Sequence, residues 1–206
     1  RLNALPQFRT AIDGLHIHFL HVRSPHADAL PLVMTHGWPG SVVEFLKVIG
    51  PLTDPTRHGG KAEDAFHVVC PSLPGYGFSD KPREPGWDAT RIGRTWGKLM
   101  QRLGYTSWVA QGGDWGAMVT TSIAQTETGH CRGVHVNMPI VAPDMDTMNE
   151  LTELEQSALA GMHHYGEWDS GYSKQQSTRP QTLGYGLADS PAGQAAWILE
   201  KFWAWT

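Results

Sequence analysis

Short apolar runs that lead directly into glycine- and proline-rich motifs are the feature that most constrains the fold of this chain. Three such runs lie at 31–35, 66–70 and 107–110, and each is followed at once by a motif of that kind. Runs of this length are typical of strands buried on both faces of a sheet. A fourth run at 133–136 ends at Asn137-Met138-Pro139.

Helical patterns separate these runs. Residues 88–103 carry one apolar stripe, and Gly104 is placed to end that helix. Ser41 and Glu44 have the spacing of a capping box, which predicts the start of another helix. Strands that alternate with helices predict an α/β fold with a mostly parallel sheet, and functional groups on such sheets gather at the carboxyl ends of the strands.

The pattern changes near residue 141. We expect residues 1–140 to form the sheet-containing core and residues 141–206 to form a helical lid. A stretch rich in Gly, Ser and Tyr at 161–190 reads as a loop. Ser190 and Pro191 then have the pattern of an N-cap and first-turn proline. The helix that follows is apolar on nearly all sides. We expect it to be buried against a packing partner that lies downstream of Thr206.

The sharpest motif follows the third apolar run, and it reads Gly112-Gly113-Asp114-Trp115-Gly116. It has the pattern of a nucleophile elbow with Asp114 in the place of serine. The glycines suit a tight turn from strand to helix, and the helix N-terminus favours an ionised carboxylate. We predict that Asp114 is a nucleophile that forms an ester, which water must then cleave. The plain alternative is that Asp114 only caps the helix.

A second motif, His36-Gly37-Trp38-Pro39, follows the first apolar run. In a fold with such an elbow, the loop after this strand supplies one oxyanion-hole N–H, and the residue after the nucleophile supplies the other. The candidate donors are therefore the backbone N–H groups of Trp38 and Trp115. Pro39 is a candidate for a cis peptide bond. His36 precedes the nucleophile in the chain, so we interpret it as structural and not as the catalytic base.

Four stretches together resemble the α/β-hydrolase epoxide hydrolases, and the fourth is similar to the microsomal-type branch in particular. These stretches are 36–41, 71–79, 112–116 and 176–191. The resemblance spans nearly the whole chain. It implies an α/β-hydrolase fold with a helical lid, no cofactor or metal, and a small-molecule epoxide as substrate. The resemblance implies a vicinal diol as product, and the Trp and Met content near the lid suggests an apolar epoxide, aromatic epoxides included.

The resemblance also implies that a lid tyrosine donates a hydrogen bond or a proton to the epoxide oxygen. Tyr172 has the matching position, with Tyr165 and Tyr185 as rivals. The family's catalytic His, its acid partner and its second lid Tyr are expected beyond Thr206, and most of the N-terminal arm is expected to precede the chain. On this interpretation the fold is incomplete at both ends, and these 206 residues alone cannot complete turnover.

Two other functions remain as alternatives. A haloalkane dehalogenase has the same fold and an aspartate nucleophile, but a halide needs N–H donors where an epoxide oxygen needs an acidic O–H. A non-catalytic α/β-hydrolase-like binding module has little need for an elbow, an oxyanion loop and a lid Tyr together. A serine-type esterase is excluded, because Asp114 stands where serine would be.

Composition narrows the remaining choices. The net charge is −4 without a basic run, which argues against nucleic acid and anionic membranes as partners. No apolar segment has the length of a membrane helix, and Cys70 and Cys131 read as core thiols, so we expect a cytoplasmic protein. His16 and His18 alternate with apolar residues and are expected to face solvent. Homo-oligomerisation is left open.

Overall fold

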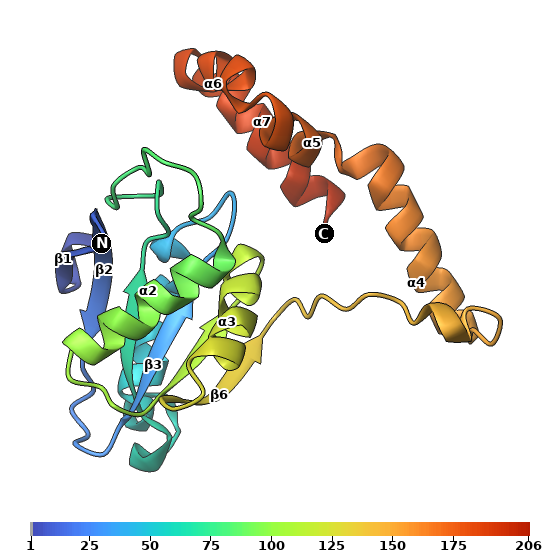
Figure 1. Cartoon of the computed structure of the whole chain (residues 1–206). Helices are drawn as coiled ribbons and strands as arrows, with labels where there is room; N and C mark the ends of the chain where they lie inside the picture. The colour runs from blue at the N-terminus through green and yellow to red at the C-terminus, as the bar shows by residue number, and fades with distance from the viewer. Residues whose placement is uncertain (1) are drawn as a thin grey trace. The chain divides into compact units, whose positions relative to one another are not determined.

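The computed structural model describes residues 2–206 of the chain (Figure 1). The chain divides into two compact units, of which the first ends at Ile140 and the second begins at Val141. We call them the sheet unit and the helical unit. Each has a hydrogen-bonded architecture of its own.

The sheet unit contains one six-stranded sheet in the order β1-β2-β4-β3-β5-β6. The strands are β1 (Gln7–Ile12), β2 (Leu15–Val22), β3 (Leu30–Thr35), β4 (Phe66–Pro71), β5 (Trp108–Gly112) and β6 (Cys131–Val136). Strands β4, β3, β5 and β6 pair in parallel, whereas the hairpin β1–β2 adds two antiparallel pairings at one edge. The four strands predicted from apolar runs are therefore confirmed, and so is the mostly parallel sheet.

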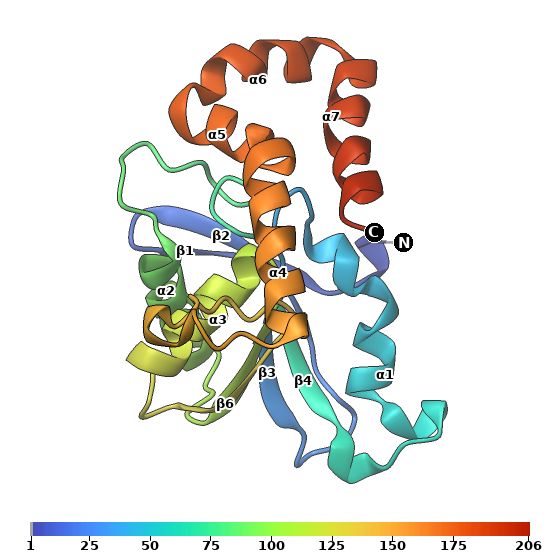
Figure 2. The ribbon, with the colours of Figure 1, turned by 90° about the vertical axis from the view of Figure 1, so that its right-hand side faces the viewer.

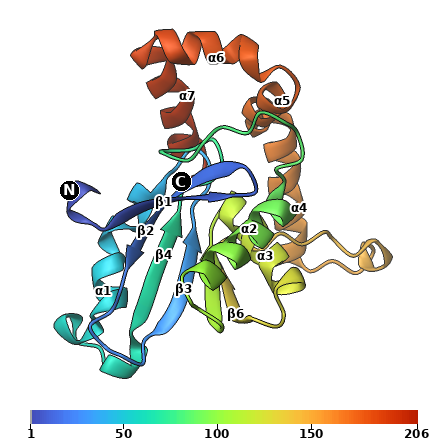
Figure 3. The ribbon, with the colours of Figure 1, turned by 60° about the vertical axis from the view of Figure 1, so that its left-hand side comes forward.

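Helices cover both faces of this sheet (Figures 2 and 3). On one face lie α2 (Ala89–Arg102) and α3 (Trp115–Thr126), and on the other lie η2 (Val42–Lys47) and α1 (Ile49–Thr53). Alternate strand residues supply the two cores. Val33 and Val69 belong to the core that contains α2 and α3, and Leu32 belongs to the core beneath η2 and α1. Burial on both faces explains why these strands read as continuous apolar runs.

The ends of the first helices follow from short polar side chains. Ser41 and Glu44 form the expected capping box, although the helix that it opens, η2, is a 3-10 helix. Helix α2 begins where the Asp88 carboxylate accepts a hydrogen bond from the Arg91 N–H at 2.8 Å. Gly104 follows α2 with a φ of +86°, a conformation that glycine adopts without strain. The helix predicted at 88–103 is thus confirmed.

His18 corrects one expectation. The alternation in β2 predicted that His16 and His18 face solvent, and His16 is indeed exposed, but His18 is buried. Its Nδ1 lies 2.9 Å from Ser72 Oγ and its Nε2 lies 3.1 Å from Gln7 Oε1. The alternation failed because the loop after β4 covers this face of β2, and that loop supplies a hydroxyl partner for the imidazole.

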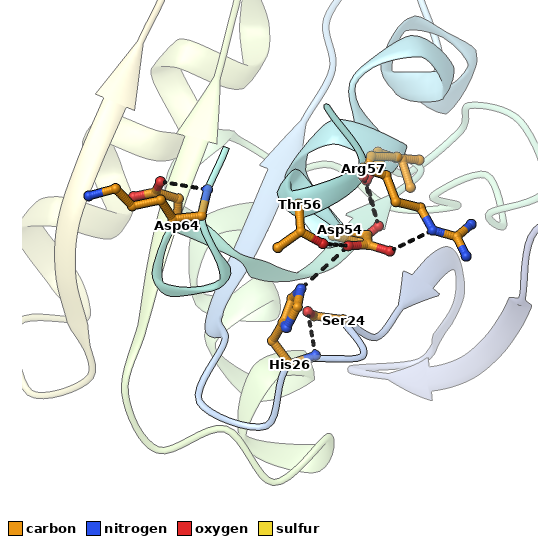
Figure 4. A network of polar contacts seen from close by, with 10 residues as sticks. Ser24, His26, Asp54, Thr56, Arg57 and Asp64 are labelled. Carbon is orange, nitrogen blue, oxygen red and sulfur yellow. Dashed lines mark hydrogen bonds and ion pairs between the residues drawn. The ribbon is translucent and has the colours of Figure 1, made fainter. Parts of the chain in front are cut away.

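A polar network fastens the loop after β2 to Asp54 and to the short helix that follows α1, η3 (Pro55–His58), while the contact of Asp64 in η4 (Ala62–Asp64) lies apart from it (Figure 4). The Asp54 carboxylate accepts a hydrogen bond from Thr56 Oγ1 at 2.7 Å and lies 3.2 Å from Arg57 Nε. His26 Nε2 lies 3.4 Å from Asp54 Oδ1. The Thr56 hydrogen bond is the main cause that lowers the pKa of Asp54. These contacts hold the far end of the sheet, away from the nucleophile.

The helical unit consists of short helices joined by tight turns. They are η5 (Met145–Thr147), α4 (Glu153–His164), a π-helical turn at Tyr165–Asp169, α5 (Gly171–Thr178), α6 (Pro180–Asp189) and α7 (Pro191–Ala204). The loop expected at 161–190 is therefore wrong. Glycine and serine lower helix propensity there, but Pro180 in the first turn of α6 favours a helix start.

Helix α7 begins as predicted, with the Ser190 side chain accepting a hydrogen bond from the Gly193 N–H at 3.0 Å. Within residues 2–206 this apolar helix is mostly exposed, and its burial against a downstream partner stays a prediction. Trp203 is 84% exposed, and Lys201 is the buried residue of the helix. The remaining apolar side chains of α7 are intermediate or exposed because the helices of this unit form a thin layer without a large core.

Candidate active site

The predicted nucleophile lies in a sharp turn between β5 and α3. Asp114 has φ 53° and ψ −127°, a strained conformation for a residue with a side chain. The turn places Asp114 at the carboxyl end of a parallel strand and at the first turn of a helix. The partial positive charge of that helix end favours a carboxylate. This is the local geometry that the elbow motif predicted.

The glycines around Asp114 are explained by close backbone contacts. A Cβ added to Gly112 would lie 2.0 Å from the Gly116 carbonyl oxygen, and one added to Gly116 would lie 1.9 Å from the Thr35 carbonyl oxygen. A Cβ on Gly37 would lie 2.2 Å from Asp114 Oδ1. These three positions exclude any side chain. Gly113 differs, because its Cβ would meet Asn137 at an ordinary 3.6 Å.

One oxygen of the Asp114 carboxylate is held by two backbone donors. The Trp38 N–H donates to Oδ1 at 2.7 Å, and the Trp115 N–H donates to the same atom at 2.6 Å. The Trp38–Pro39 peptide bond is cis, and the Gly40 N–H closes the turn by donating to the Gly37 carbonyl at 3.0 Å. The structure thus brings together the predicted nucleophile and both predicted oxyanion-hole donors.

His36 lies beneath this turn with both ring nitrogens engaged. Its Nε2 accepts a hydrogen bond from the Leu73 N–H at 3.1 Å, so its Nδ1 carries the proton and donates to the Gly37 carbonyl at 3.0 Å. Burial lowers the pKa of His36, against smaller opposing effects of Gly37 and of the Asp114 charge. A neutral, fully bonded imidazole joins two loops, which favours the structural role over that of a base.

Glu44 is a neighbour of Asp114 whose proximity the sequence did not indicate. Its Oε1 accepts a hydrogen bond from the Ser41 N–H at 3.1 Å, and its carboxylate fills the space beside Gly40. Burial, and to a smaller extent the Asp114 charge, raise the pKa of Glu44. The capping-box spacing predicted the hydrogen bond, but only the fold places this second carboxyl near the first.

The three tyrosines named as candidate donors lie in the helical unit. Tyr172 stands in the first turn of α5, and its hydroxyl lies 3.1 Å from the Tyr165 hydroxyl. Tyr185 is exposed, and its hydroxyl accepts a hydrogen bond from Gln181 Nε2 at 2.8 Å. A recess of about 640 Å³ borders Tyr172, together with Trp168, Trp197 and Lys201. Tyr172 and Tyr165 therefore form a pair, and Tyr185 stands apart from it.

Within residues 2–206, no group of three or more His, Cys, Asp or Glu side chains is arranged to hold a metal ion. None of the helices described there is long and apolar enough to cross a membrane. Cys70 is buried and Cys131 is partly exposed, and both are free thiols.

Two protein-family models match this chain. The model described as "alpha/beta hydrolase fold" matches residues 31–180, and the model described as "Epoxide hydrolase N terminus" matches residues 1–45. The chain belongs to the alpha/beta hydrolase fold family. The predicted fold class is thereby confirmed, because this hydrolase fold has the mostly parallel sheet described above.

Individual relatives of this alpha/beta hydrolase are named as epoxide hydrolases, which confirms the predicted resemblance. A protein of Stigmatella aurantiaca (strain DW4/3-1) with a provisional epoxide hydrolase name is 61% identical over 205 residues, which cover 100% of this chain and 47% of the relative. Epoxide hydrolase 1 of Oryctolagus cuniculus is 43% identical over an alignment that covers 100% of this chain and 49% of the length of that relative. The chain spans about half the length of these relatives.

A solved structure agrees with the sequence relatives. The juvenile hormone epoxide hydrolase from the silkworm Bombyx mori superposes with a TM-score of 0.83 and 37% identity, over 100% of this chain and 51% of that chain. This alpha/beta hydrolase therefore shares both the fold and a substantial part of its sequence with a structurally characterised epoxide hydrolase.

Proposed function

We propose that the protein containing this chain is an epoxide hydrolase that uses Asp114 as its nucleophile. The proposal rests mainly on two hydrogen bonds. The backbone N–H groups of Trp38 and Trp115 both donate to one carboxylate oxygen of Asp114, Oδ1. Fixing Oδ1 directs the other oxygen, Oδ2, toward a substrate. The relatives named as epoxide hydrolases support the choice of an epoxide.

The first step makes an ester. Asp114 Oδ2 attacks a ring carbon of the epoxide, and the carbon–oxygen bond of the ring breaks. The ring oxygen takes a proton from the hydroxyl of Tyr172, and a hydroxyalkyl ester of Asp114 results. Tyr165, whose hydroxyl lies 3.1 Å from that of Tyr172, supports the donor. Residues 141–206 act as a lid in this scheme.

The second step cleaves the ester. A water molecule attacks the ester carbonyl carbon, and negative charge develops on Oδ1, the atom that already accepts the N–H groups of Trp38 and Trp115. Donors already in place stabilise that charge without further rearrangement. Collapse of the intermediate breaks the bond between the ester carbon and the alcohol oxygen. One proton of the water goes to that oxygen, the other returns to the Tyr172 phenolate, and a vicinal diol and the Asp114 carboxylate result. No histidine of this chain is assigned as the base that activates the water.

The substrate class follows from the side chains around the proposed donor. Trp168 and Trp197 border the recess beside Tyr172, and Met145 and Met162 are exposed in the same unit. Aromatic and thioether groups favour apolar partners. We infer an apolar epoxide, with aryl epoxides as the first class to test.

Intact mass spectrometry of the full-length protein during turnover of styrene oxide tests the proposal. We expect diol formation and a transient mass increase of one epoxide, located on Asp114 by peptide mapping. Asp114→Asn should abolish the adduct and lower the turnover rate by roughly 10³-fold or more. The control is Asp28→Asn, which changes an exposed carboxylate of the same unit.

Two outcomes would reject this function. Release of halide from a haloalkane without diol from epoxides would identify a dehalogenase. A folded, full-length protein that forms neither an adduct nor a diol, and releases no halide, would favour a binding module.

A further inference from the structure

The helical unit has an unusual buried residue. Of residues 141–206, all of which the structure describes, Lys201 is the one that is buried, with 4% of its surface exposed. Removing an ammonium group from water costs free energy unless other groups compensate for the lost hydration. The apolar side chains around it on α7 are more exposed than this charged one. Lys201 therefore needs an explanation that hydrophobic burial does not give.

The contacts of Lys201 show what compensates for its burial. Its Nζ donates to Glu200 Oε1 at 2.8 Å, but the Glu200 side chain is about half exposed, so that ion pair is partly in water. On its other side, Nζ lies 4.9 Å from the ring centroid of Tyr172 and 6.0 Å from that of Trp205. The first distance is well within the range of a cation–π interaction.

Tyr172 is in turn held from several sides. The Trp205 ring packs edge-on against it, with 5.3 Å between ring centroids. The Tyr165 hydroxyl meets its hydroxyl at 3.1 Å. Its ring therefore has a cation at its face and an aromatic ring near its edge. The same tyrosine borders the recess of the helical unit, as does Lys201.

We propose that Lys201 is a positioning residue for the proton donor Tyr172. Its ammonium group holds the phenol ring in place and stabilises the negative charge that grows on the phenol oxygen during proton transfer. The inference rests on the proposed function, in which the Tyr172 proton moves to the epoxide oxygen as the ring bond breaks. The phenolate left behind then regains a proton from water.

Charges near Tyr172 set the sign of the expected pH effect. The groups that face it include Lys201 from α7 and Tyr165 from the π-helical turn, and Glu200 opposes Lys201. A positive charge near the ring favours loss of the phenol proton. Removing that charge should therefore move the alkaline limb of the rate profile to higher pH, whereas removing the Glu200 charge should move it to lower pH.

The test compares Lys201→Met with Lys201→Arg in the full-length protein. Single-turnover reactions with styrene oxide, quenched and measured by mass spectrometry, give separate rates for ester formation and ester hydrolysis. We expect Lys201→Met to slow ester formation roughly fivefold and to leave the rate of hydrolysis unchanged. The alkaline limb of the rate profile should move to higher pH. Lys201→Arg keeps a cation and should restore most of the rate.

Two further variants keep the test decisive. Lys174→Met removes an exposed lysine from α5, the helix of Tyr172, and should change neither rate. Glu200→Gln alters a half-exposed side chain and should move the alkaline limb of the rate profile to lower pH. This result can be obtained even if Lys201→Met fails to fold.

Opposite results would overturn the inference. Equal slowing of both steps in Lys201→Met, or an alkaline limb that stays in place in Glu200→Gln, would reduce Lys201 to a packing residue. Failure of the proposed function would look different, because the wild-type protein would then form no Asp114 ester at all.

Discussion

The sheet unit and the helical unit hold their candidate functional residues in different ways. In the sheet unit, Asp114 accepts two backbone hydrogen bonds above cores whose side chains reach 0% exposure. In the helical unit, Tyr172 is held by other side chains in a layer whose single buried residue is a lysine. The comparison teaches that the two candidate groups depend on different interactions, and that substitutions in the two units should have unequal effects.

The largest difference is expected between two glycine-to-alanine changes. Gly116→Ala places a Cβ 1.9 Å from the Thr35 carbonyl oxygen, so the elbow must shift and the Trp115 N–H must move with it. We expect epoxide turnover to fall roughly 10²-fold or more, the size of effect that follows loss of an oxyanion-hole donor. Steady-state kinetics of the full-length protein measures it.

Gly161→Ala is the matched change in the helical unit. Nothing lies within 4 Å of the added Cβ, and Gly161 is inside α4. Alanine should stabilise that helix by about 0.5–1 kcal/mol and leave turnover intact. Similar losses of activity in both variants would contradict the comparison.

A second pair tests the packing of the two units. Leu99 in α2 is 0% exposed and Leu199 in α7 is 62% exposed. We expect Leu99→Ala to lower the free energy of unfolding by about 2–5 kcal/mol, because it leaves a cavity. Leu199→Ala should change it by less than about 0.5 kcal/mol. Denaturant unfolding of the full-length protein gives both values, and an equal loss would show that α7 has a packed face.

The smallest effect concerns pH. Burial lowers the pKa of His36 and of His18 below the ordinary value of 6.5. The unfolded chain therefore takes up these protons first, so the stability from the neutral imidazoles is complete above pH 6.5 and is lost as the pH falls below it. We expect a lower melting temperature at about pH 5.5 than at about pH 7.5, with a smaller change than Leu99→Ala causes.

Two variants sharpen that measurement. His36→Gln should reduce the dependence on pH, since one of the two groups that titrate is gone. His163→Gln changes an exposed position of the helical unit and serves as the substitution control. A melting temperature that does not change between the two pH values would contradict the assignment.

Much of the sheet unit could be predicted because its signals are local. The elbow motif specified a strand, a strained residue and a helix within 112–116, and the structure has all three. Apolar runs predicted the four parallel strands for the same reason. His18 escaped prediction because its partner Ser72 is far along the chain, and alternation within one strand does not show what covers it.

The helical unit was predicted less well. Its composition between 161 and 190 indicated a loop, since glycine and serine weaken helices, but the structure contains three helical segments there. Lys201 could not be anticipated, because its neighbour Tyr172 belongs to a different helix and no spacing in the sequence joins them.

The donors that hold Asp114 Oδ1 are main-chain N–H groups, and this has a consequence for mutational scanning. Any residue other than proline at 38 or 115 still supplies the N–H, so a scan would score both tryptophans by their side chains alone. The intolerant positions should instead be 37, 112 and 116, where a single added methyl group has no space. A map of the substitutions that this protein tolerates would therefore show the site that stabilises the negative charge as a cluster of irreplaceable glycines around one aspartate.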